Sequence, residues 1–108
     1  MKRMPFTAQT ASGDTFDIEF PLHDDTGDPV RVGQLVGAVL ETLDREIAVL
    51  GETSNGDVLQ AVAMAIAVRA EMVHAPHETL EKLTLSLVQT ALDAVGESTH
   101  HQRPIGHA

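Results

Sequence analysis

The chain has 108 residues, of which 43% are apolar and only 3% aromatic, and its formal net charge is −9 at pH 7. This length predicts one domain, and the apolar content argues against a wholly disordered chain. The acidic balance argues against nucleic acid and against anionic membranes as partners, because both are bound through clustered Lys and Arg. The absence of cysteine excludes disulfides, a thiol nucleophile and a cysteine-ligated zinc site.

The N-terminal segment carries Lys2 and Arg3, but no apolar run of signal-peptide length follows them. The longest apolar stretch, Val58 to Val68, is interrupted by Gln60 and is too short to span a bilayer. We therefore expect a cytoplasmic protein.

Residues 6–22 are predicted to form a β-hairpin. Phe16, Ile18 and Phe20 alternate with acidic residues, which is typical of a half-buried strand. The turn segment before them contains Gly13, which can adopt a positive φ. A lone hairpin is marginal in water, so its apolar face should pack on the helices. Its unpaired edges also favour pairing of two hairpins across a two-fold axis.

Three helices are expected after the hairpin, over about residues 29–50, 55–74 and 76–95. Apolar residues recur at steps of three and four in the first and third of these segments. Pro29 is suited to the first position of a helix, and Ser54 is expected to cap the second helix. These elements predict an α+β fold that is mainly α.

The second of these helices is predicted to be central and largely buried. Its segment from Asp57 to Val73 contains no Gly or Pro and is apolar on nearly every side, which indicates a helix surrounded by protein. Arg69 is interpreted as the exposed end of this helix, with its stem covering apolar neighbours. Three helices of this size cannot enclose such a helix, so the excess apolar surface predicts a homodimer.

Residues 98–108 are polar and without periodicity, and they are predicted to form a disordered tail behind a single globular domain over residues 1–97. Three of the six histidines, His100, His101 and His107, belong to this tail.

The other histidines that invite a metal hypothesis are His74 and His77, at the corner between the second and third helices. Pro76 separates them, and no second histidine stands four residues after His77, as an HExxH motif requires. The structural interpretation places His74 at a helix C-terminus and His77 in the following turn. The alternative function is a small-molecule or metal-binding protein that uses these two residues.

Gly33 and Gly37 form a GxxxG step in the first helix. Because Gly costs roughly 1 kcal/mol relative to Ala inside a helix, the pair suggests a tight contact with another element. The alternative interpretation is that the helix begins later than Pro29, near Gln34.

The run around Asp24, Thr26 and Asp28 resembles the start of a calcium loop. A calcium loop of the EF-hand type requires Glu at the twelfth position, where this chain has Leu35, so an Asp-rich connector explains the run better. We find no motif for nucleophilic catalysis or phosphate binding.

The sequence therefore predicts a small acidic interaction or accessory protein that acts as a homodimer, with no catalytic residue and no cofactor. An accessory subunit that needs a different protein to cover its apolar surface is a further possibility.

Overall fold

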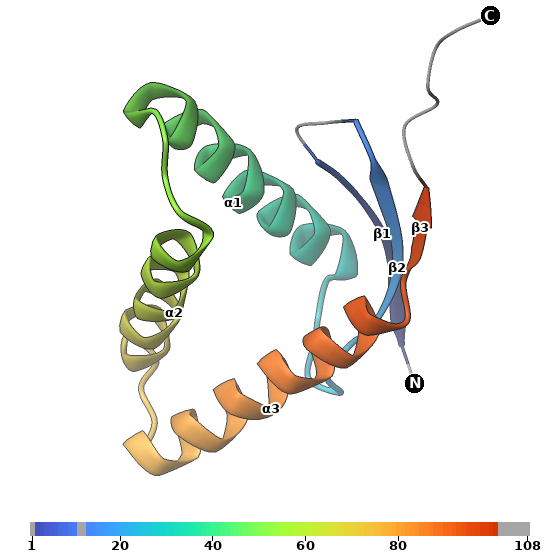
Figure 1. Cartoon of the computed structure of the whole chain (residues 1–108). Coiled ribbons are helices and arrows are strands. Elements are labelled where there is room, and N and C mark those ends of the chain that lie inside the picture. The colour runs from blue at the N-terminus through green and yellow to red at the C-terminus, as the bar shows by residue number, and fades with distance from the viewer. Residues whose placement is uncertain (1, 11–12, 102–108) are drawn as a thin grey trace, which may run out of the picture. The chain divides into compact units, whose positions relative to one another are not determined.

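The computed structural model describes residues 2–10 and 13–101 of the chain. Its elements follow the order β1 (Arg3–Gln9), β2 (Thr15–Pro21), α1 (Pro29–Leu50), α2 (Asn55–Glu71), α3 (His77–Gly96) and β3 (Thr99–His101) (Figure 1). The predicted α+β class, a hairpin followed by three helices, is confirmed.

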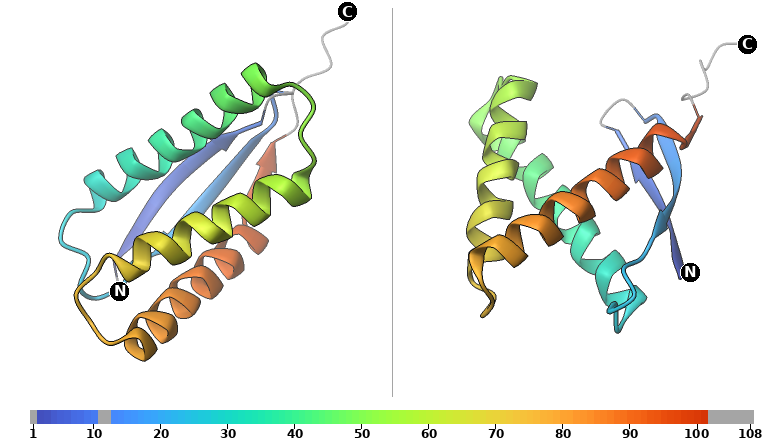
Figure 2. Two further views of the ribbon diagram at one scale, coloured as in Figure 1. Left: turned by 90° about the vertical axis from the view of Figure 1, so that its left-hand side faces the viewer. Right: turned by 90° about the horizontal axis from the view of Figure 1, so that it is seen from below.

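The sheet is built on the predicted hairpin. β1 and β2 are antiparallel, with Met4 opposite Phe20 and Phe6 opposite Ile18, and the strands run side by side in every view (Figures 1 and 2). Alternate residues of a strand share one face, so these four apolar side chains lie together. Met4 and Ile18 are buried, and the rings of Phe6 and Phe20 are 6.2 Å apart between centroids.

The hairpin turn has the chemistry that its sequence indicates. Gly13 adopts a φ of 93°, which an L side chain rarely accepts. The backbone N–H of Thr10 donates to the carbonyl of Asp14 at 2.8 Å. Two of the predicted turn residues, Ala11 and Ser12, lie outside the described residues.

A third strand corrects the prediction of a tail from residue 98. β3 pairs antiparallel with β2, placing Thr99 opposite Asp17 and His101 opposite Thr15. Three residues are too few to show a period-2 pattern, so this strand arises from the free edge of β2 and not from a local signal. Residues 102–108 of the predicted tail lie outside the described residues.

α1 begins at Pro29, so the interpretation that this helix starts near Gln34 is wrong. It ends where predicted, at Leu50. The next residue, Gly51, has a φ of 90° and donates its N–H to the carbonyl of Ile47 at 3.0 Å. A glycine in this left-handed conformation commonly closes a helix.

α2 is capped by Ser54, whose hydroxyl accepts the N–H of Asp57 at 3.1 Å, as predicted. The helix ends at Glu71, three residues earlier than predicted. Met72 and Val73 donate to carbonyls only three residues back, and such tighter bonds commonly finish a helix. The predicted boundary depended on Pro76, which restricts only the residue before it.

The described residues form two compact units. One contains the sheet and the second half of α3 from Leu87, and the other contains Val30 to Ser86. The prediction that α2 is largely buried is wrong for the single chain, because all 17 residues of this helix are described and none is buried. The prediction that residues 1–97 form a single domain stays untested.

Candidate interaction surface

The exposed apolar surface belongs to the helical part of the chain. Among the described residues, every large apolar side chain that is exposed lies between Val30 and Val95. The ones on α1 are Val30, Leu35, Val39, Leu40, Val49 and Leu50. The others are Leu59, Met64, Ile66, Val68, Met72 and Val73 on and after α2, and Leu83, Leu85, Leu87, Val88, Leu92 and Val95 on α3. Single exposed apolar residues are ordinary, but whole helices of them mark an interaction surface.

α2 presents two apolar faces, because successive residues of a helix are rotated by about 100°. The branched face is formed by Leu59, Val62 and Ile66. About a third of a turn away lies the alanine face, formed by Val58, Ala61, Ala65 and Val68. Leu59 is 70% exposed and Val68 is 59% exposed, whereas Val58 and Val62 are half-buried, so the chain leaves each face partly uncovered.

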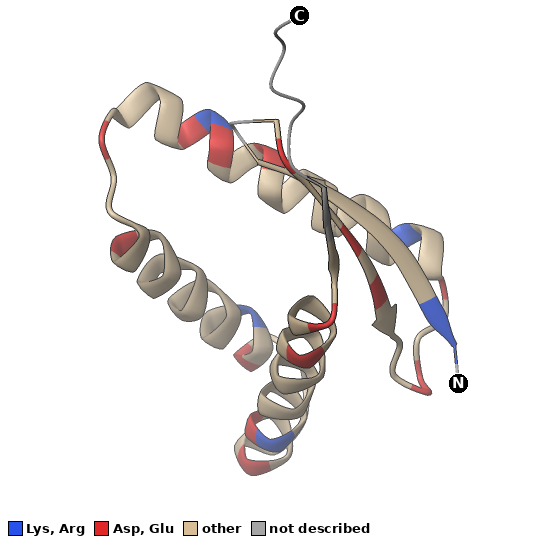
Figure 3. Cartoon of the chain, turned by 45° about the vertical axis from the view of Figure 1, so that its right-hand side comes forward, with Lys and Arg blue, Asp and Glu red and all other residues tan. Residues whose placement is uncertain are grey.

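The polar residues of α2 occupy the remaining side of the helix and its two ends. Asp57, Gln60 and Glu71 lie on this side together with the exposed Met64, and Arg69 lies exposed in the last turn, at the angle between the two apolar faces. Between Asp57 and Arg69 the helix carries no charge (Figure 3). Between its two ends the helix therefore presents apolar side chains with no charged residue among them.

α1 adds an open position to this surface. A Cβ atom built on Gly37 would meet no atom within 4 Å. The tight contact that the Gly33–Gly37 step suggests is therefore not made at Gly37 by the chain itself.

The corner between α2 and α3 holds a polar cluster that the sequence did not reveal. The Nδ1 of His77 lies 2.9 Å from a carboxylate oxygen of Glu71, and its Nε2 lies 3.8 Å from Glu81. The hydrogen bond and charge of Glu71 raise the pKa of His77 above its ordinary value of about 6.5, and Glu81 adds to this shift. The pairing joins residues six apart across a proline, a spacing that no helical periodicity signals.

The histidines proposed for a metal site differ in position from their predicted places. α2 ends at Glu71, so His74 lies in the connection, while His77 is the first residue of α3. The described residues contain no group of three or more His, Cys, Asp or Glu side chains able to hold a metal ion. The alternative of a ligand site at His74 and His77 stays a prediction.

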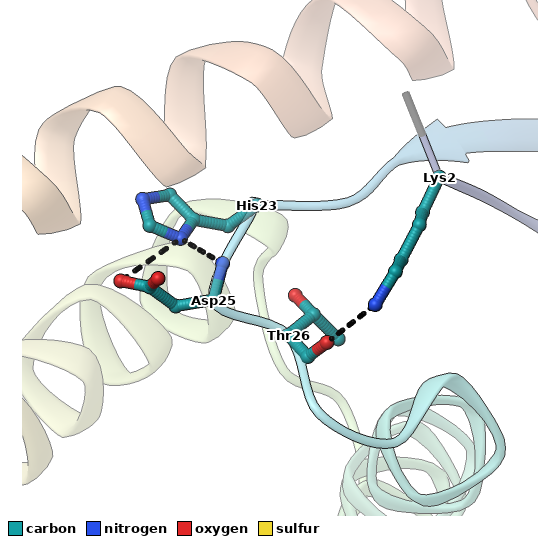
Figure 4. Close-up of polar contacts among 4 residues, drawn as sticks. All are labelled: Lys2, His23, Asp25 and Thr26. Carbon is teal, nitrogen blue, oxygen red and sulfur yellow. Dashed lines mark hydrogen bonds and ion pairs between the residues drawn. The ribbon is translucent and has the colours of Figure 1, made fainter.

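The Asp-rich loop before α1 is organised by contacts within the loop and with the N-terminal segment (Figure 4). The Nδ1 of His23 accepts the backbone N–H of Asp25 at 3.1 Å. The ammonium of Lys2 donates to the carbonyl oxygen of Thr26 at 3.2 Å, so a cationic side chain already contacts this loop. These contacts agree with a structural connector.

Comparison of this chain with protein-family models, with curated proteins and with solved structures gives no match. None of the helices in the described part of the chain is both long and apolar enough to cross a membrane. The functional proposal therefore rests on the exposed apolar side chains of the helices.

Proposed function

We propose that this protein is a self-associating interaction module that acts as a homodimer through the apolar surface of its helices. The observation that carries the proposal is α2, which has two apolar faces and no buried residue. A helix with apolar residues on two sides is stable in water only when other protein covers both of them.

A second copy of the chain is the favoured partner, because most soluble oligomers are homo-oligomers and the two-fold symmetric dimer is the commonest of them. Two chains of net charge −9 repel each other. The uncharged middle of α2 lets the copies meet while the acidic groups stay in water, where salt screens their repulsion beyond about 8–10 Å.

Size-exclusion chromatography with light scattering tests the proposal. At tens of micromolar we expect a mass of about 23 kDa, twice the 11.6 kDa of one chain. Because the contact is apolar, raising the salt concentration from about 0.1 M to 0.5 M should not dissociate it. A mass of 11.6 kDa at this protein concentration would overturn the proposal. Aggregation of the isolated chain, together with a single different co-purifying protein, would replace the homodimer with a complex of unlike chains.

A further inference from the structure

We infer that this protein has no stable folded monomer, and that α2 folds only as a second copy covers its branched and alanine faces. The inference rests on the proposed homodimer and specifies how that dimer forms: association and folding of the helices are one step.

The first support is the lack of a core in the helical unit. Leu80 is the one buried residue between Val30 and Ser86, and neither α1 nor α2 buries any residue. Most helical stability in proteins comes from packing an apolar face and not from helix propensity. Within one chain, α2 has no buried side chain that would supply such packing.

The second support is that the two faces of α2 suit each other. The branched face has the bulk of Leu59 and Ile66, whereas Ala61 and Ala65 leave room on the alanine face. Well-packed helices place large residues against small ones, and small residues allow helix axes to approach to about 8 Å. A surface that carries both shapes on one helix is self-complementary, as a contact between identical copies requires.

The inference predicts that unfolding depends on protein concentration. Urea unfolding of the full chain is followed by far-UV circular dichroism at about 1 μM and 100 μM, and the midpoint should be about 1 M urea higher at the greater concentration. A midpoint independent of concentration in a protein of about 23 kDa would overturn the inference and leave the homodimer standing. A mass of 11.6 kDa at both concentrations would overturn the inference and the proposed function together.

A pair of glutamate variants tests the faces of α2. Ala65→Glu puts a carboxylate into the alanine face, while Gln60→Glu puts the same side chain on the polar face of the same helix. At about 10 μM we expect Ala65→Glu to lose the dimer and most of its helical signal together. Gln60→Glu should keep the wild-type mass and a midpoint within about 0.3 M urea.

Two results for Ala65→Glu would contradict the inference. A dimer with the wild-type midpoint would mean that a second copy does not cover the alanine face. A monomer with the wild-type helical signal and a cooperative transition would mean that the chain folds alone, and the proposed dimer would then be an association of folded monomers.

Discussion

The sheet and the helices of this protein bury apolar surface to different extents. In the sheet, Met4 and Ile18 are buried and the three phenylalanines are half-buried. In the helices, Leu80 alone is buried, and large apolar side chains such as Leu50 and Leu59 are 75% and 70% exposed. The deficit of burial in this small chain is therefore local to its helices.

The difference follows from how each element distributes its apolar residues. β2 alternates apolar and polar residues, so the sheet has one apolar face and needs one covering layer. α2 has two apolar faces and needs neighbours on two sides. A sheet with one apolar face can be covered within a small domain, whereas α2 requires more covering protein than its own chain provides.

The largest expected effects come from replacing one isoleucine by alanine in each region, which tests whether the helices are buried in the dimer as fully as the sheet is. We expect Ile18→Ala in β2 and Ile66→Ala in α2 each to lower the free energy of unfolding of the dimer by about 2–4 kcal/mol, the cost of emptying a buried site. Urea unfolding at one fixed protein concentration measures both values.

The outcome for Ile66 separates a monomer from a dimer. Ile66 is 38% exposed in the single chain. If it stayed so in solution, its replacement by alanine would change stability by less than about 1 kcal/mol, since alanine is also the better helix former. A large effect at Ile18 with a negligible effect at Ile66 would contradict coverage of the branched face.

Much of the fold could be predicted because local chemistry determined it. The alternation of Phe16, Ile18 and Phe20, the cap at Ser54 and the glycine at residue 51 each act within a few residues along the chain. The formation of a helix by the alanine-rich segment of α2 was also predictable, because that segment contains strong helix formers and no Gly or Pro from Asp57 to Val73. These features were confirmed in the structure.

The rest depends on neighbours that the sequence does not identify. β3 forms because β2 has a free edge, and α2 ends at Glu71 through backbone bonds that any residue can make. The contact of Glu71 with His77 depends on the geometry of the corner between two helices.

The smallest expected effect concerns the pKa of His77, which contacts Glu71 at the corner between α2 and α3. Because the folded-state pKa of His77 is raised, the pair with Glu71 contributes its full stability below the unfolded value of about 6.5 and loses it as pH rises through the folded pKa. NMR titration of wild type and of Glu71→Gln measures this difference. The pKa of His77 should fall in Glu71→Gln, and in Glu81→Gln it should fall less. An unchanged pKa in Glu71→Gln would contradict the pairing.

Isotope-filtered NMR on a sample that mixes labelled and unlabelled chains tests most directly whether a second copy covers α2. We expect nuclear Overhauser contacts from the methyl groups of Leu59, Ile66 and Val68 to protons of the other chain, and no such contacts from the side chain of Gln60. The opposite result, in which all contacts of these methyl groups arise within one chain, would contradict coverage by a second copy.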